Sequence, residues 1–351
     1  MSPGVSGRRP CVRPERVAGA FLLRRALWAI PTLFGVAVVV FVLLRVVPGD
    51  PIAMMIPPGA RTEDIANLRA LYGLDKPIVT QFGVWLGEVA RGHFGVSISL
   101  RQDVMKLVLG RLPATLELCL VAIVIAVGAG LALGVAAAYW RRRWPESVID
   151  LVSGLGLAIP DFLWGLLFIL VLGVLWPVLP VSGRLDPRLE FDPHTQFYLV
   201  EALLTARFDI VGGLCAHLIL PAVALALPLA AALARVVKAS INEVMNQDYV
   251  MLARVKGYSR ARIIRSVALR NALIPAVTLT GVQFTFLVGG TVLIETIFSY
   301  PGIGNLAIGA VIQRDLPLIQ GLVLCFAVLF IAINLAVDAA YVLLDPRVRT
   351  R

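Results

Sequence analysis

The sequence has few charged residues for its length. Asp, Glu, Lys and Arg make up 15% of the 351 residues and hydrophobic residues 59%, whereas a soluble domain has roughly 25% and 45–50% of these classes. The mean hydropathy is +0.86. One buried core cannot hold so much apolar surface, so the composition excludes an ordinary soluble domain and predicts an all-α polytopic membrane protein.

Several functional motifs are also missing. There is no G-x-x-x-x-G-K-[ST] phosphate loop, so we expect no ATP hydrolysis and no cofactor on this chain. There is no G-x-S-x-G motif either, which argues against an intramembrane hydrolase. The four cysteines form no C-x-x-C pair, and His217 is better explained as a polar residue at a helix start than as a metal ligand.

The net charge of +10 does not predict nucleic-acid binding, because the basic residues lie between apolar runs instead of along one face. Most of the 32 Lys and Arg fall in segments that would share one side of a membrane, and the two shorter loops on the other side hold few. The bias of basic residues toward cytoplasmic loops therefore predicts that both termini are cytoplasmic.

Apolar runs long enough to cross a bilayer occur six times. We expect spans at about Leu27–Leu44, Ala114–Ala138, Val148–Leu175, Leu218–Ala234, Leu273–Phe298 and Leu318–Leu344. The third contains Pro160, which is tolerable where neighbouring groups bond the freed backbone.

These spans divide the chain into segments. We expect a disordered basic tail (1–20), a first transmembrane helix (21–47), an outer segment (48–113), a core of five further helices (114–345) with a cytoplasmic loop (238–271), and a short cytoplasmic tail (346–351). The outer segment should contain a helical stretch at Glu63–Leu71 and an apolar-periodic stretch through Trp85.

A few ionisable residues lie within or beside the spans, where they are costly. Asp161, near the middle of the third span, is the candidate for a residue that lines a pathway. Glu117 and Glu295 lie near span ends, so their side chains should reach water. Asp338 and Asn334 should form hydrogen bonds between helices.

The loop between the fourth and fifth spans has a helical pattern. Apolar residues recur at three- and four-residue spacing, which predicts one amphipathic helix with a single apolar face: Ile241, Val244, Met245, Tyr249, Leu252 and Val255. Gly257 can end this helix in the left-handed conformation, and Ser259 can cap a second helix. Such an elbow suits docking on another protein, and periodicity alone equally allows a helix pair lying on anionic lipid.

This loop resembles the EAA loop of binding-protein-dependent ABC importer permeases, in particular the dipeptide, oligopeptide and nickel branch. The resemblance spans about Leu23 to Arg349 and rests on several motifs in one order: Trp28–Leu33, Val47–Pro51, Tyr72–Pro77, Arg111–Leu118, Asp248–Pro275, Phe298–Gly304 and Leu344–Arg347. Ala253 and Gly257 match the loop motif, whereas Met251 and Leu252 stand where its Glu and first Ala would be.

The resemblance implies a function and partners. It implies a permease of the bacterial cytoplasmic (inner) membrane that pairs with a second permease, two ATPase subunits that bind ATP and Mg, and an external solute-binding protein. The residues implied to couple to an ATPase are Asp248, Tyr249, Ala253, Lys256, Gly257, Ser259 and Arg262. Peptides are the leading solute, and nickel or another small solute stays open. An ion-coupled secondary transporter is the other alternative, with Asp161 as its one fitting residue.

Overall fold

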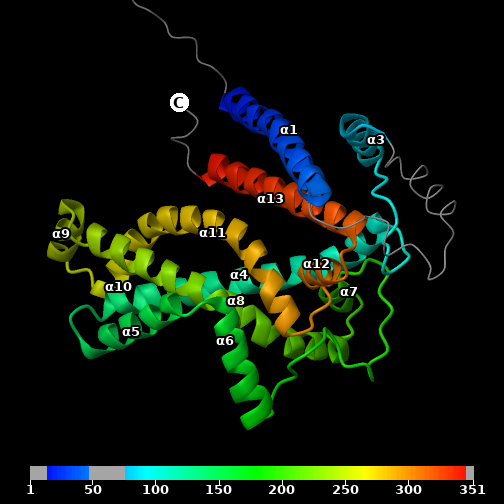
Figure 1. The fold of residues 1–351 in the computed structure, drawn as a ribbon. Helices are drawn as coiled ribbons and strands as arrows, with labels where there is room; N and C mark the ends of the chain where they lie inside the picture. Colours follow the sequence, from blue (N-terminus) through cyan, green and yellow to red (C-terminus); the bar gives the residue numbers. More distant parts are fainter. Residues whose placement is uncertain (1–13, 47–75, 345–351) are drawn as a thin grey trace, which may run out of the picture.

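A computed structural model describes residues 14–46 and 76–344 (Figure 1). Within these ranges the chain is helical, with a single isolated bridge between Val96 and Asp103. The elements are α1 (Pro14–Val46), α3 (Ile78–Ala90), α4 (Val104–Tyr139), α5 (Trp144–Ala158), α6 (Asp161–Phe168), the π-helical η1 (Ile169–Leu175), α7 (Tyr198–Leu204), α8 (Phe208–Val244), α9 (Asp248–Val255), α10 (Arg260–Ile263), the π-helical η2 (Ile264–Ala268), α11 (Leu269–Ile297), α12 (Ile303–Ile312) and α13 (Leu316–Leu344).

The long helices form a bundle whose two ends differ. Helix α8 packs against α4, α5 and α11, while α1 packs along α13. Helices α9 and α10 lie at one end of the bundle, and α3, α7 and α12 gather at the other (Figure 1). Five helices of the described residues are long and apolar enough to cross a membrane, or six if one bent pair counts as a span.

Small residues allow the central pair of helices to approach closely. Every fourth residue of one face of α4 is Ala or Gly and is buried: Ala122, Ala126, Gly130, Gly134 and Ala138. A Cβ atom on Gly134 would lie 2.7 Å from the carbonyl oxygen of Ala234 and from Cβ of Val237 on α8. Close backbone contact of this kind gives dispersion energy where no hydrophobic effect acts between helices.

The third span is not the continuous helix that the apolar run predicted. It consists of α5 and the α6–η1 segment, which are bent by 104° to one another. Pro160 has no N–H to donate and restricts the residue before it, so Ile159 is extended with φ −97° and ψ 124°. Asp161 consequently lies at the first turn of α6, not in the middle of a helix.

The other five spans are confirmed, although most boundaries differ. Helix α4 begins at Val104, before the predicted start at Ala114, and α1 begins at Pro14, inside the tail expected to end at residue 20. The stretch through Trp85 is helical as α3. The helix expected at Glu63–Leu71 lies outside the described residues. Helices α7 and α12 were not predicted, because each is short and flanked by irregular chain.

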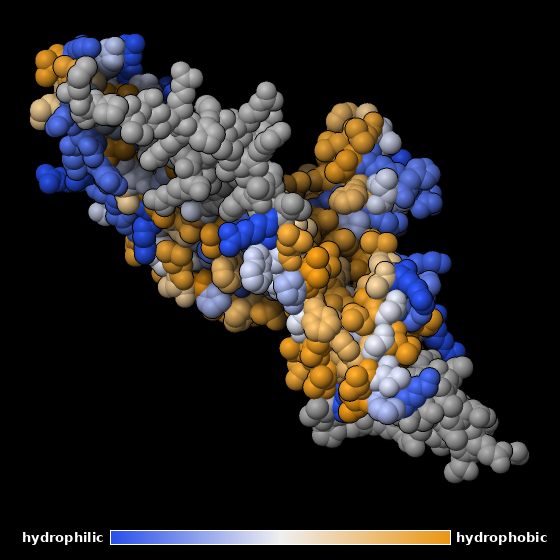
Figure 2. Space-filling view, turned by 90° about the horizontal axis from the view of Figure 1, so that it is seen from above, coloured by the Kyte–Doolittle hydropathy of each residue, from blue (hydrophilic) through white to orange (hydrophobic). Residues whose placement is uncertain are grey.

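The surface agrees with a lipid environment. Large apolar side chains are exposed along α1, α4, α5 and α6, for example Val39, Val124 and Leu151. Figure 2 shows hydrophobic residues over much of the middle of one face and hydrophilic residues toward both ends. Asp338 of α13 pairs with Arg25 of α1 at 2.9 Å, which confirms the expected contact between helices, while the Asn334 amide donates to Phe330 O within α13.

Candidate functional site

The predicted elbow is present between α9 and α10. Lys256 ends α9, and Gly257 has φ +79°. The N–H of Gly257 donates to Arg254 O at 2.9 Å, and the N–H of Tyr258 donates to Ala253 O at 3.2 Å. These two bonds form a Schellman motif, and the residue that adopts the left-handed conformation in this motif is usually glycine. The sequence therefore predicted this turn correctly.

The second helix begins where Ser259 was expected to cap it. Ser259 is extended, and its hydroxyl oxygen accepts from the N–H of Arg262 at 3.4 Å. Ile263, Ile264 and Ala268 are buried. Helix α10 continues through η2 into α11 without a break. A displacement of the elbow would therefore also move the start of α11.

The first helix differs from the prediction. The apolar pattern from Ile241 to Val255 does not form one helix, because the chain turns between Val244 and Asp248. Ile241 is buried at the end of α8. The bulky apolar residues of α9 are mostly exposed: Tyr249, Met251, Leu252 and Val255, the last at 80%. An exposed apolar patch on a short projecting helix is typical of a docking surface.

The remaining predicted loop residues surround this patch. Asp248 is the first residue of α9, where a carboxylate interacts favourably with the helix dipole. The Tyr249 hydroxyl accepts from Asn271 Nδ2 at 3.3 Å, and Ala253 packs against the core. Lys256 is exposed, and the Arg262 guanidinium lies 4.4 Å from the centre of the Tyr258 ring.

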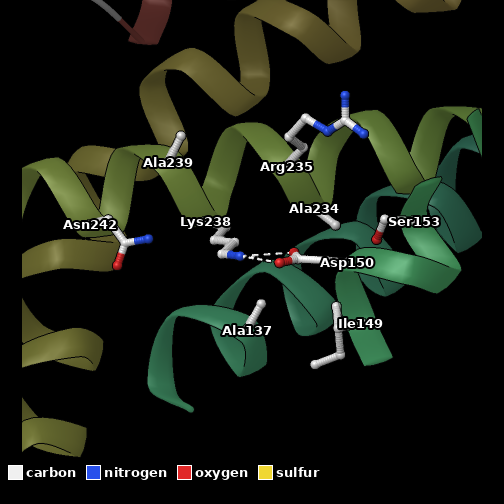
Figure 3. Close-up of a pocket in the computed structure, with 9 residues that line it drawn as sticks. All are labelled: Ala137, Ile149, Asp150, Ser153, Ala234, Arg235, Lys238, Ala239 and Asn242. Atoms are coloured by element: carbon white, nitrogen blue, oxygen red, sulfur yellow. Dashed lines mark hydrogen bonds and ion pairs between the residues drawn. The ribbon is translucent and has the colours of Figure 1, made fainter. Parts of the chain in front are cut away.

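A cavity with both apolar and charged residues on its walls lies between α5 and the C-terminal part of α8. It has a volume of about 380 Å³. Lys238 of α8 reaches across to α5 (Figure 3), where its Nζ lies 2.7 Å from Glu146 and 2.6 Å from Asp150. Ser153, which also lines the cavity, is buried. The ion pairs connect α5 to the part of α8 that leads into the elbow.

Asp161 lies at the junction of the bent span. It is half-buried, and its Oδ1 accepts from the N–H of Phe162 at 2.7 Å. A Cβ atom on Gly290 of α11 would lie 2.6 Å from Asp161 Oδ2. The carboxylate is thus seated against the bare backbone of α11.

Glu295 and Glu117 are buried, so the prediction that they reach water is wrong. Glu295 is 0% exposed. Its Oε2 accepts from the N–H groups of Gly304 and Asn305 at 2.8 and 3.0 Å, which are among the unbonded donors at the start of α12. The Thr115 hydroxyl donates to Glu295 Oε1 and accepts from the N–H of Ile303. One buried carboxylate and one hydroxyl therefore cap α12.

Glu117 serves the other short helix in the same way. Its Oε1 accepts from the N–H of Leu199 in the first turn of α7 at 2.9 Å, and its Oε2 lies 2.6 Å from Arg184 Nη2. Arg184 also donates to Gln196 O and lies 3.8 Å from the Tyr198 ring centre. Glu117 lies in the Arg111–Leu118 motif, and Glu295 lies three residues before the Phe298–Gly304 motif. No spacing in the sequence pairs Glu117 with Arg184 or Glu295 with Thr115.

The comparisons with known proteins agree with this architecture. Residues 130–350 match the model of the binding-protein-dependent transport system inner membrane component, and residues 19–119 match its N-terminal model. The chain belongs to this family of membrane permeases.

Among its relatives, the chain is 41% identical to the di/tripeptide transport system permease protein DppB of Pseudomonas aeruginosa, over 94% of this chain and 98% of that protein. It is 37% identical to the dipeptide transport system permease protein DppB of Escherichia coli, over the same shares. Its fold is similar to a chain of the MetNI methionine ABC transporter in an inward-facing conformation, with a TM-score of 0.50 at 19% identity, over 70% of this chain and 98% of that one.

Proposed function

We propose that this chain is one of two permease subunits of an ATP-driven importer of di- and tripeptides. The observation that carries the proposal is the identity of 41% and 37% to peptide permeases over 94% of the chain. An importer of this kind also needs a surface for an energy source, and the elbow with its exposed apolar residues on α9 supplies one.

Two ATPase subunits would bind ATP and Mg and close on each other. The patch of Tyr249, Met251, Leu252 and Val255 would seat in one of them. Since α10 runs through η2 into α11, closure would move the inner end of α11 against α8 and reorient the pathway. The sequence has no phosphate loop of its own, which fits this division of roles.

The chain would lie in a bacterial inner membrane with α9, α10 and both termini in the cytoplasm. The basic residues of the α4–α5 turn and of the elbow support this orientation. The opposite end, which carries α3, α7 and α12, would receive the solute from a binding protein. Asp161 would line the pathway, since a half-buried carboxylate in a span normally faces water, solute or a partner group.

Reconstitution tests the proposal. Vesicles holding this chain, the second permease, the two ATPases and the binding protein should accumulate a labelled dipeptide when ATP is enclosed with the ATPases. Uptake driven by an ion gradient without ATP would show a secondary transporter instead. ATP-dependent uptake of nickel, with none of dipeptides or tripeptides, would show that the solute is wrongly assigned.

A further inference from the structure

A second cavity, of about 520 Å³, lies between the α4–α5 turn and the elbow. Its walls come from both, together with the end of α8. The lining residues are Arg141, Arg142, Asn242, Met245, Asn246, Arg254, Tyr258, Arg260 and Ile263. Four of the nine carry a guanidinium group, and none of these described lining residues is acidic.

Two of the arginines are fixed by helix ends. Arg260 Nη2 donates to Ala138 O in the last turn of α4 at 2.8 Å, and Arg254 Nη2 donates to Met245 O at the end of α8 at 3.1 Å. Carbonyl groups at a helix C-terminus carry partial negative charge, so they hold these guanidinium groups in place. Two hydrogen bonds to backbone carbonyls therefore hold these exposed guanidinium groups at the cavity.

None of the four arginines forms a salt bridge with a carboxylate of the described residues. Glu146, whose charge acts on Arg141, is already bonded by Lys238 at 2.7 Å. Arg141 and Arg142 add two more positive charges beside the fixed pair. Like charges at such proximity repel, and an anion with several acceptor oxygens would relieve the repulsion through charge-assisted hydrogen bonds.

The position of the cavity indicates the source of the anion. The α4–α5 turn is bordered by Trp140 and Trp144, which are 38% and 78% exposed. Exposed tryptophans at the end of a span mark the depth of lipid headgroups. The apolar docking patch of α9 is made of other residues than Arg254, which faces the cavity. An ATPase docked on that patch would therefore not need to cover the arginines.

We propose that this cavity binds the headgroup phosphate of an anionic phospholipid of the cytoplasmic leaflet. The lipid would bridge the α4–α5 turn and the coupling elbow, and would steady the elbow in the position from which α10 leads into α11. Basic pockets at the cytoplasmic side of spans take such headgroups. The proposal does not depend on which solute is carried.

The test uses the complete transporter in phosphatidylcholine nanodiscs with or without phosphatidylglycerol, released into the gas phase for native mass spectrometry. The wild type should retain phosphatidylglycerol. Arg141→Gln combined with Arg142→Gln should retain it at least about a hundredfold more weakly, because each change removes a charge-assisted hydrogen bond that contributes about tenfold or more. The matched control is Arg143→Gln, in the same turn but outside the cavity, and it should lose no more than the roughly fivefold that any basic residue near an anionic surface contributes.

Two further arms make the result decisive. The double Lys variant at the same positions keeps the charge and should retain most of the lipid, which separates loss of charge from loss of folding. Inorganic phosphate added in phosphatidylcholine alone should not occupy the cavity. Equal lipid retention by wild type and the double Gln variant would overturn the proposal, as would occupancy by inorganic phosphate alone or a cross-link from Arg142→Cys to an ATPase.

Discussion

Thr115 and Glu295 are 180 residues apart in the chain and are joined by a hydrogen bond of 2.6 Å between Thr115 Oγ1 and Glu295 Oε1. Together they bond three N–H groups in the first turn of α12. This arrangement joins α4 and α11 to the short helix α12. The joint lies at the end of the bundle opposite the elbow (Figure 1).

Replacing Glu295 with Gln should destabilise the cap of α12. The amide oxygen can accept from the N–H groups of Gly304 and Asn305, but the NH2 group then faces the Thr115 hydroxyl, which loses its acceptor. We expect a loss of about 1–3 kcal/mol. Thermal unfolding of the purified permease measures it. Glu190→Gln, at an exposed position, is the control and should unfold as the wild type does. Identical midpoints for all three proteins would show that the cap contributes nothing.

Arg184→Gln should be more damaging than a typical surface change. It leaves the buried Glu117 carboxylate, which is 4% exposed, without its cation, and breaking a buried pair in this way costs about 3–5 kcal/mol. The double variant with Glu117→Gln should recover part of the loss, because the unpaired charge is then gone. A double-mutant cycle on thermal stability checks this, and strict additivity of the two losses would contradict a coupled pair.

Gly134→Ala tests the close approach of α4 and α8. The new methyl group would press on the backbone of Ala234, and overpacking of this kind costs about 1–3 kcal/mol. The control, Gly128→Ala, lies on the same helix with nothing within 4 Å of the added Cβ. It should leave stability unchanged or slightly improved, since Ala favours helix more than Gly does. Thermal unfolding of the purified variants in detergent measures their stability. Equal effects of both changes would contradict the close approach.

The stability of the contact between Asp315 and the segment of Ser97 and Ser99 should depend on pH. Asp315 Oδ2 accepts from the Ser97 and Ser99 hydroxyls and from the Ser99 N–H. Burial alone would raise the pKa of Asp315, but these hydrogen bonds outweigh it and hold the pKa below its ordinary value. The carboxylate's contribution to stability is thus complete above the ordinary Asp pKa of about 4 and is lost as pH falls through the lowered value.

In Asp315→Asn this acid-sensitive contribution to stability should be absent, and acid-unfolding curves of the wild type and the variant would reveal the difference. Superimposable curves would argue against the bonds.

Sequence reasoning predicted the spans and the elbow because both depend on local chemistry. A long apolar run has few alternatives in a bilayer, and a glycine followed by a serine caps two helices within a few residues. The elbow at Gly257 and Ser259 was therefore predicted to the residue. The break at Pro160 was visible as a proline, but its 104° bend depends on how α6 packs against α8 and α11.

The buried glutamates could not be predicted in the same way. Position near a span end suggested that Glu117 and Glu295 reach water, and only the fold brings Arg184 and the start of α12 to them. The apolar spacing from Ile241 to Val255 was misleading for a related reason. The apolar residues at the end of α8 are buried, and those of α9 are exposed. Both sets have the same three- and four-residue spacing, so the sequence looked like one continuous helix.

We propose that the elbow transmits ATPase closure, and substitutions at Gly257 test this role. Gly257 has φ +79° with nothing within 4 Å of an added Cβ, so a substitution acts through the backbone and not through a clash. A left-handed conformation costs a non-glycine residue about 1–2 kcal/mol, and a β-branched one more. Asn tolerates that conformation and serves as the matched control.

The measurement is solute-stimulated ATP hydrolysis of the reconstituted transporter, with co-purification of the ATPases. Gly257→Val should insert normally yet lose ATPase association or the stimulation by solute, while Gly257→Asn should keep both. Full association and full stimulation in Gly257→Val would contradict a coupling role for the elbow.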